Sequence, residues 1–184
     1  MPRLIAWLLA SLLIFCGGWG AAPALASLSD DRYDGNIYSL YAGNGSLVPP
    51  RTTLAEAREA GRVVVLVYYL DDSAVSKQFA PVVSELQRLW GKAVELLPLV
   101  TDPLQNRNDQ GPSDPAHYWN GTIPQVVVLD ASGTVRFDAS GAVDVDAINA
   151  ALSAVTGIPL PEGGSLSSTV SFNELNSEVV SRSQ

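Results

Sequence analysis

The eight residues from Val63 to Leu70 constrain the fold of this chain more than any other stretch. They read Val-Val-Val-Leu-Val-Tyr-Tyr-Leu, without one charged side chain. β-Branched and aromatic residues favour strands, and a strand that is apolar at every position is typical of the centre of a sheet buried on both faces. The sequence therefore predicts a central strand over Val63–Leu70, in a sheet that is covered on both sides.

Apolar spacing and end signals predict the other elements of an α/β domain. Thr53 and Glu56 form a capping-box pattern before a short helix, and Asp144 precedes the last one. A glycine in the turn between two apolar runs indicates a hairpin. The expected ranges are a helix over Leu54–Ala60, a helix from about Lys77 to Trp90, a strand over Val94–Val100, a hairpin of Gln125–Leu129 with Thr134–Phe137, and a helix over Val145–Thr156.

The first 26 residues have the features of a secretory signal peptide. Arg3 is followed by the apolar run Leu4–Phe15, and Ala24-Leu25-Ala26 offers a cleavage site before Ser27. The run is shorter than the roughly 20 residues that span a bilayer. Cleavage after Ala26 is the preferred interpretation, and an uncleaved anchor, which would associate the protein with a membrane, is the alternative. The bulky Phe15 before Cys16 argues against lipidation at that cysteine.

Removal of residues 1–26 leaves a mature chain without cysteine. Its net charge becomes −9, because Arg3 is the only charged residue removed from a chain of charge −8. No disulfide can form, so stability must come from core packing. The acidic balance and the lack of a cluster of Lys and Arg argue against a nucleic-acid partner.

The remaining boundaries follow from composition. Residues 27–53, rich in Gly, Asn and Pro, are expected to form an irregular lead-in that drapes over the domain. Residues 54–160 are expected to form the domain itself. Residues 161–184 form a C-terminal tail, for which a docking segment, a weak amphipathic helix and a loosely ordered terminus all stay open.

Two short stretches resemble the thioredoxin-like superfamily. Residues 73–81, Ser-Ala-Val-Ser-Lys-Gln-Phe-Ala-Pro, are similar to that superfamily's C-x-x-C-K-x-x-A-P, with Ser73 and Ser76 in the cysteine places. Ile123-Pro124 resembles the Ile-Pro of the loop that faces the redox site, where the peptide bond is cis. The resemblance implies a thioredoxin-like α/β fold, with a central mixed sheet flanked by helices, an irregular N-terminal lead-in and a short C-terminal tail.

Serine at both cysteine places removes the thiolate on which thioredoxin chemistry depends. Two further departures agree with that loss: Val67 replaces the superfamily's buried acid, and Asp72 replaces its tryptophan. We expect Ser73 to cap the following helix instead. The segment Ser73, Ala74, Val75 and Ser76 is therefore expected to be a degenerate redox site with no catalytic residue, no metal and no cofactor.

A serine hydrolase is a further alternative, from a different class of function. Ser73 or Ser76 would need a general base within hydrogen-bond distance, and His117 is the only histidine of the chain. We expect His117 to be a surface or capping residue, which disfavours this alternative.

A narrower likeness extends over nearly the whole mature chain. Residues 38–53, residues 69–73 and Ser171–Asn176 look like the cyanobacterial thioredoxin-like family named for photosystem I accumulation in the thylakoid membrane. The resemblance implies an accessory or assembly factor at the thylakoid lumen or membrane, with photosystem I subunits or other assembly factors as partners. It also implies a cysteine at the second place, where this chain has Ser76. The periplasm is the alternative location.

A cysteine-free copy of the fold can still bind extended peptide in the groove that redox relatives use. The residues expected to line this groove are Asp72, Ser73, Thr122, Ile123 and Pro124. The leading hypothesis is therefore a redox-inactive accessory protein that binds a protein partner. The alternative is a protein of the thiol–disulfide oxidoreductase type that acts through cysteines of its partner.

Overall fold

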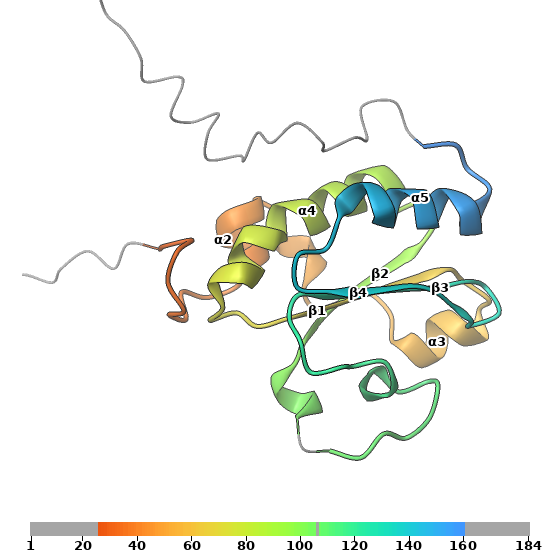
Figure 1. Ribbon diagram of the computed structural model, residues 1–184, viewed down its shortest axis with the longest axis horizontal. Helices are drawn as coiled ribbons and strands as arrows, with labels where there is room; N and C mark the ends of the chain where they lie inside the picture. Colours follow the sequence, from red (N-terminus) through yellow and green to blue (C-terminus); the bar gives the residue numbers. More distant parts are fainter. Residues whose placement is uncertain (1–25, 106, 161–184) are drawn as a thin grey trace, which may run out of the picture.

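The computed structural model describes residues 26–105 and 107–160. Four strands form one sheet in the order β2-β1-β3-β4, with β1 parallel to β2 and antiparallel to β3, which in turn is antiparallel to β4 (Figure 1). Helices α2, α4 and α5 lie over one face, and α3 lies on the other. The elements are α2 (Ile37–Ala42), α3 (Leu54–Glu59), β1 (Val64–Tyr69), α4 (Ala74–Trp90), β2 (Glu95–Val100), β3 (Gln125–Leu129), β4 (Val135–Ser140) and α5 (Val145–Thr156), with 3₁₀ turns η1 (Gly45–Leu47), η2 (Asp102–Leu104) and η3 (Pro115–His117).

This arrangement confirms the predicted α/β class and its thioredoxin-like topology. A parallel β-α-β unit is followed by an antiparallel hairpin and a final helix, and the Ile123-Pro124 bond that precedes β3 is cis. Within the described residues no helix is long and apolar enough to cross a membrane. The predicted signal peptide, apart from Ala26, and the tail of residues 161–184 lie outside the described residues.

Strand β1 is buried along its whole length, as its composition predicts. Val65, Val67 and Tyr69 face the core under α2, α4 and α5. The alternate residues Leu66 and Tyr68 face α3 and the loops beside it. Because side chains alternate along a strand, one apolar run supplies both cores.

Strand β2 accommodates Pro98 because of the direction in which its backbone points. Glu95 N donates to Val63 O, and Thr101 N donates to Tyr69 O, so odd-numbered residues of this strand bond to β1. The nitrogen of Pro98 therefore points away from β1, because β2 is an edge strand of the sheet that the described residues form. A proline fits a strand only at such a place, because it has no N–H to donate.

The lead-in is more regular than its composition predicts. Residues 37–42 form α2, capped by Asn36, whose side-chain oxygen accepts bonds from the backbone N–H of Tyr38 and Ser39. Ile37 and Tyr38 are buried against α4, and the Tyr38 ring meets the Tyr69 ring edge-on at 5.1 Å. The prediction of an irregular lead-in is wrong for these residues, because tertiary packing stabilises a helix of only two turns.

The remaining boundaries differ from the predicted ones by a few residues. Helix α4 begins at Ala74 and not at about Lys77, because Ser73 caps it. Strand β4 continues to Ser140, three residues beyond the predicted end, because it pairs with β3 as far as Gln125. Asp144 caps α5 as predicted, and its side chain accepts a bond from the N–H of Asp146.

The capping box of α3 gives a first prediction. The Thr53 hydroxyl accepts from Glu56 N at 3.2 Å, and the Glu56 carboxylate accepts from Thr53 N at 2.8 Å. We expect Thr53→Ala to lower the free energy of unfolding by about 1 kcal/mol in urea titrations. Thr122→Ala is the control, since its exposed hydroxyl bonds to nothing among the described residues; an equal loss in both variants would contradict the prediction.

Candidate functional site

The two serines in the cysteine places serve the backbone at the start of α4. The Ser73 hydroxyl accepts a bond from the N–H of Ser76 at 3.5 Å, the capping role that the sequence predicts. The Ser76 hydroxyl accepts a bond from the N–H of Leu70 at 3.1 Å. Ser73 is 9% exposed and Ser76 is 1% exposed. Both hydroxyls therefore hold the turn between β1 and α4 in place.

The structure brings the predicted groove residues to one end of the sheet. Tyr68 pairs with Gln125, so Pro124 lies beside the end of β1, from which the chain continues to Asp72 and Ser73. Pro124 is buried, Ile123 is half-buried and Thr122 is exposed. Beside them, Val75 is 49% exposed at the first turn of α4. Asp72, the remaining predicted groove residue, is exposed directly before Ser73, so this end of the sheet offers small apolar and polar side chains beside one carboxylate.

His117 is not placed as a base for either serine. It lies in η3, where its Nδ1 is 2.7 Å from Asp109 Oδ2 and its ring meets the Tyr118 ring edge-on. Tyr118 in turn packs against the core on the α3 side of the sheet. The surface interpretation of His117 agrees with this position, and no Ser–His pair is formed among the described residues.

The ammonium group of Lys77 is the centre of a second cluster, which we call the clasp: Lys77 together with residues 27–34 of the lead-in. Lys77 is 0% exposed. Its Nζ lies within 3.3 Å of five oxygen atoms, all from the lead-in. They are the backbone oxygens of Ser27, Asp30 and Arg32 and the carboxylate oxygens Oδ1 of Asp30 and Oδ2 of Asp34, the last at 2.8 Å.

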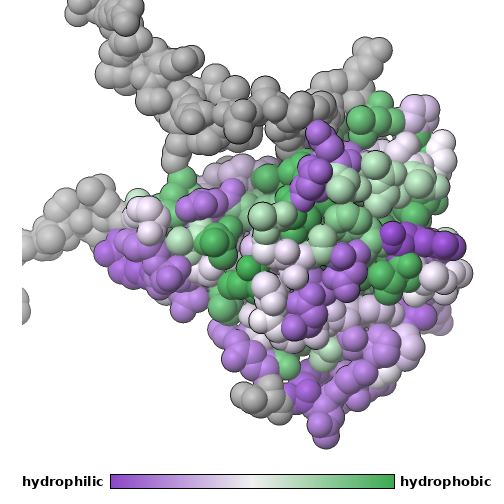
Figure 2. Space-filling view, in the orientation of Figure 1, coloured by the Kyte–Doolittle hydropathy of each residue, from purple (hydrophilic) through white to green (hydrophobic). Residues whose placement is uncertain are grey.

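Further bonds spread the lead-in across the first two turns of α4. Asp31 Oδ1 accepts from the N–H of Ala74 at 2.8 Å, which satisfies an otherwise free donor at the helix start. Gln78 Nε2 donates to Leu28 O at 3.2 Å. In Figure 2, hydrophilic residues gather where the lead-in meets α4. The helix end at which redox relatives react is therefore covered on one side by the protein's own N-terminal segment.

The charges of the clasp stabilise one another. Hydrogen bonds from Lys77 and Tyr41 hold the pKa of Asp34 well below its usual range. Burial alone would lower the pKa of Lys77, but its bonds to Asp34 and Asp30 outweigh burial and raise that pKa. Both groups are charged at neutral pH, and neither is free to transfer a proton.

Sequence reasoning did not find the clasp. The sequence pattern gives Lys77 only as the lysine of the thioredoxin-like motif at the expected start of a helix, and Asp30-Asp31-Arg32-Tyr33-Asp34 only as part of the lead-in. The one sequence signal that could have indicated the clasp is the group of three carboxylates within five residues, Asp30, Asp31 and Asp34, in a chain with few lysines.

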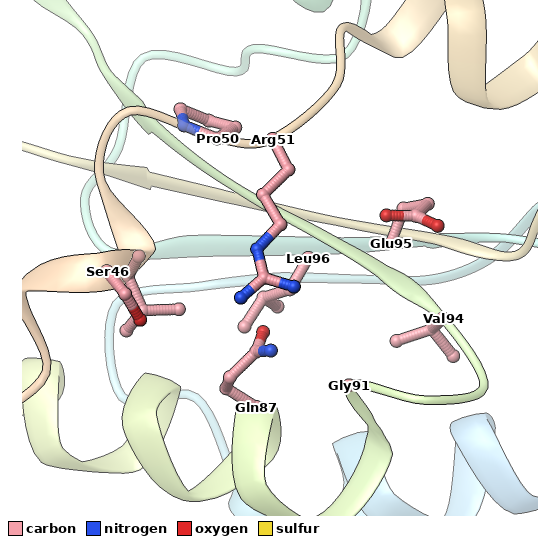
Figure 3. A pocket seen from close by; sticks show the side chains of 9 residues that line it. Ser46, Pro50, Arg51, Gln87, Gly91, Val94, Glu95 and Leu96 are labelled. Carbon is pink, nitrogen blue, oxygen red and sulfur yellow. The ribbon is translucent and has the colours of Figure 1, made fainter.

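Two hollows lie away from this end, on either side of Pro50 and Arg51 where they pass the edge strand β2. Figure 3 shows the Arg51 side chain reaching between Ser46 and Leu96 towards Gln87, in a hollow of about 40 Å³, little more than the room of one water molecule. The other hollow, about 410 Å³, has a mostly apolar wall that includes Leu54, Leu97, Leu99 and Pro115. Neither is lined by the predicted groove residues.

Comparison with known proteins decides the family. Thylakoid membrane protein slr1796 of Synechocystis sp. is 41% identical over 181 residues, which cover 94% of this chain and 90% of the relative. This chain belongs to the family of that protein. Family membership thus extends over nearly the whole sequence and not only over the sheet and its helices.

Other comparisons add little to this assignment. No family model matches the sequence. The crystal structure of the pneumococcal exposed lipoprotein thioredoxin Etrx1 from Streptococcus pneumoniae aligns with a TM-score of 0.44 and 16% identity, over 55% of this chain and 89% of that one. At that level the likeness carries nothing about chemistry.

The clasp gives a second prediction. Lys77→Met keeps most of the side-chain volume but leaves Asp34 buried without its ammonium partner, which is strongly unfavourable. We expect the lead-in to detach, so that trypsin cleaves after Arg32 faster by on the order of tenfold or more, while hydrogen exchange in α5 changes little. Lys92→Met, at an exposed lysine, is the matched control. Unchanged cleavage in Lys77→Met would contradict a clasp held by this charge.

The pKa shifts give a third prediction. The pKa of Asp34 is lowered, so its contribution to stability is complete above the unfolded value of about 3.9 and is lost as pH falls through the folded pKa. The pKa of Lys77 is raised, so its contribution is complete below about 10.4 and is lost as pH rises further. In a chain acetylated at Ser27, which has no α-amino group to titrate there, NMR signals of residues 27–34 should keep their positions between about pH 5 and pH 10. Detachment of the lead-in within that window would show that other groups hold it.

Proposed function

We propose that this protein is a redox-inactive accessory factor that supports photosystem I accumulation at the thylakoid membrane by binding protein partners. The observation that carries the proposal is the use of both serine hydroxyls at the degenerate site. Ser73 caps α4, and Ser76 bonds to the N–H of Leu70, so the positions that perform chemistry in thioredoxins are part of the scaffold here.

Two considerations support binding as the remaining role. First, Val75 and Thr122 are exposed at this end of the sheet, where Ile123 is half-buried and Asp72 adds one carboxylate, and exposed side chains of this kind can contact extended peptide. Second, the Synechocystis relative slr1796 is named a thylakoid membrane protein, which agrees with the resemblance to the photosystem I accumulation family. On this proposal the partners are photosystem I subunits or their assembly factors, met in the thylakoid lumen or at its membrane.

Cross-linking tests the partner and the surface together. The chain from Ser27 to Gln184 has no cysteine, so Val75→Cys provides one attachment point for a photoreactive probe. On thylakoid membranes of the source organism, we expect Val75→Cys to cross-link to a photosystem I subunit or assembly factor. Ala131→Cys, on the exposed turn between β3 and β4, is the matched control and should not. Equal products from both positions would remove this surface from the proposal.

An insulin-reduction assay tests the loss of redox chemistry. We expect the wild-type chain from Ser27 to reduce insulin no faster than a blank, because it has no thiol. The double variant Ser73→Cys/Ser76→Cys is the positive control, since it restores two thiols at one helix start. Activity of the wild type above the blank would contradict the redox-inactive proposal.

A further inference from the structure

The backbone N–H and the backbone carbonyl of Ser27, the second described residue, both form hydrogen bonds. Its N–H donates to Asp34 Oδ2 at 3.4 Å. Its carbonyl oxygen accepts from Lys77 Nζ and from the Tyr41 hydroxyl, each at 3.2 Å. The preceding residue, Ala26, is exposed. The residue that follows the predicted signal cleavage site is thus fixed, whereas the residue before that site is directed to solvent.

The Asp34 carboxylate is nearly buried and already binds one cation. Its side chain is 8% exposed, and Oδ2 already accepts from the Tyr41 hydroxyl at 2.6 Å and from Lys77 Nζ at 2.8 Å. The other oxygen, Oδ1, accepts from Arg32 Nε at 3.2 Å. A carboxylate with these partners is ionised at neutral pH, so Oδ2 is a negatively charged acceptor beside the Ser27 nitrogen.

The charged groups of the clasp come from the lead-in and from α4, and among the described residues Asp34 is the one that contacts the Ser27 nitrogen. The lead-in contributes the carboxylates of Asp30, Asp31 and Asp34 and the guanidinium of Arg32, and α4 contributes the ammonium of Lys77. Helix α2 contributes only the neutral hydroxyl of Tyr41. Oδ2 of Asp34 therefore meets the Lys77 ammonium and, at the Ser27 nitrogen, a neutral donor; a positively charged donor in its place would bind the carboxylate more strongly.

Signal cleavage supplies that cation. Hydrolysis of the Ala26–Ser27 peptide bond by the signal peptidase adds the hydroxyl of water to the Ala26 carbonyl carbon and a proton to the Ser27 nitrogen. The new α-amino group has an ordinary pKa of about 7.7–8.0 and takes up a second proton at neutral pH. A neutral donor thereby becomes an ammonium group with three N–H donors at the same place.

We propose that Asp34 is the binding site of the α-ammonium group that signal cleavage creates at Ser27, so that processing itself completes the clasp. Among the described residues, the buried core lies between Ile37 and Leu152, apart from the clasp. Processing decides how tightly the lead-in is held over the start of α4. The cleaved chain closes that helix end more firmly than the uncleaved precursor.

Three chains that differ only at the N-terminus test the proposal. The first begins at Ser27 with a free amino group, the second is the same chain acetylated at Ser27, and the third begins at Ala22 and keeps five residues of the predicted signal. Thermal unfolding is measured from pH 6 to pH 11, and the pKa of the Ser27 amino group is measured by NMR.

The free amino group should raise Tm at pH 6 by roughly 2–4 °C over both blocked chains, which corresponds to a modest ion pair in a chain of this length. Pairing with Asp34 raises the folded pKa above the unfolded value of about 7.7–8.0. The added stability is therefore complete below that value and lost as pH rises through the folded pKa. Equal Tm values for the three chains at pH 6 would overturn the proposal.

Two variants locate the effect. Asp31→Asn, which removes a neighbouring carboxylate bonded to Ala74 N, should preserve the difference between free and acetylated chains, whereas Asp34→Asn should abolish it. If Asp34→Asn does not fold, the amino pKa of the wild-type chain decides. A pKa at or below the ordinary value means that Asp34 does not bind the new N-terminus.

Discussion

The placement of one ammonium group, that of Lys77, determines how residues 27–34 are arranged. A lysine without solvent contact must find oxygen partners, because burying an unpaired charge is prohibitively unfavourable. Here every partner comes from a segment some 43–50 residues earlier in the chain. Residues 27–34 are therefore fixed along α4 by a requirement of charge, whereas α2, further along the lead-in, is held by the burial of Ile37 and Tyr38.

Local patterns in the sequence predicted much of the fold. The apolar run of β1, the capping box at Thr53 and the cap at Ser73 each involve residues within a few positions of one another, where spacing alone carries the information. The clasp and α2 depend on contacts between distant segments. Nothing in the residues around Lys77 indicates that it is buried, and nothing around Ile37 reveals that α4 will cover it.

The candidate site shows the same division. That Ser73 and Ser76 stand in the places of a redox pair is a prediction from the sequence, based on the residues around them that keep the superfamily pattern. Their present hydrogen bonds could not, apart from the cap, since the bond between Ser76 and Leu70 depends on how β1 meets α4. A serine hydroxyl accepts a backbone N–H readily, which explains how a scaffold can persist after its thiols are lost.

The chemistry of the clasp also determines which solution conditions can release residues 27–34 from α4. Disulfides in exported proteins open and close with the reducing power of their compartment. The clasp, by contrast, consists of carboxylate and carbonyl oxygens around a buried ammonium, which reductants do not change. Burial also shields the Lys77–Asp34 ion pair from dissolved salt. The attachment of residues 27–34 to α4 therefore contains no bond that a reductant could open.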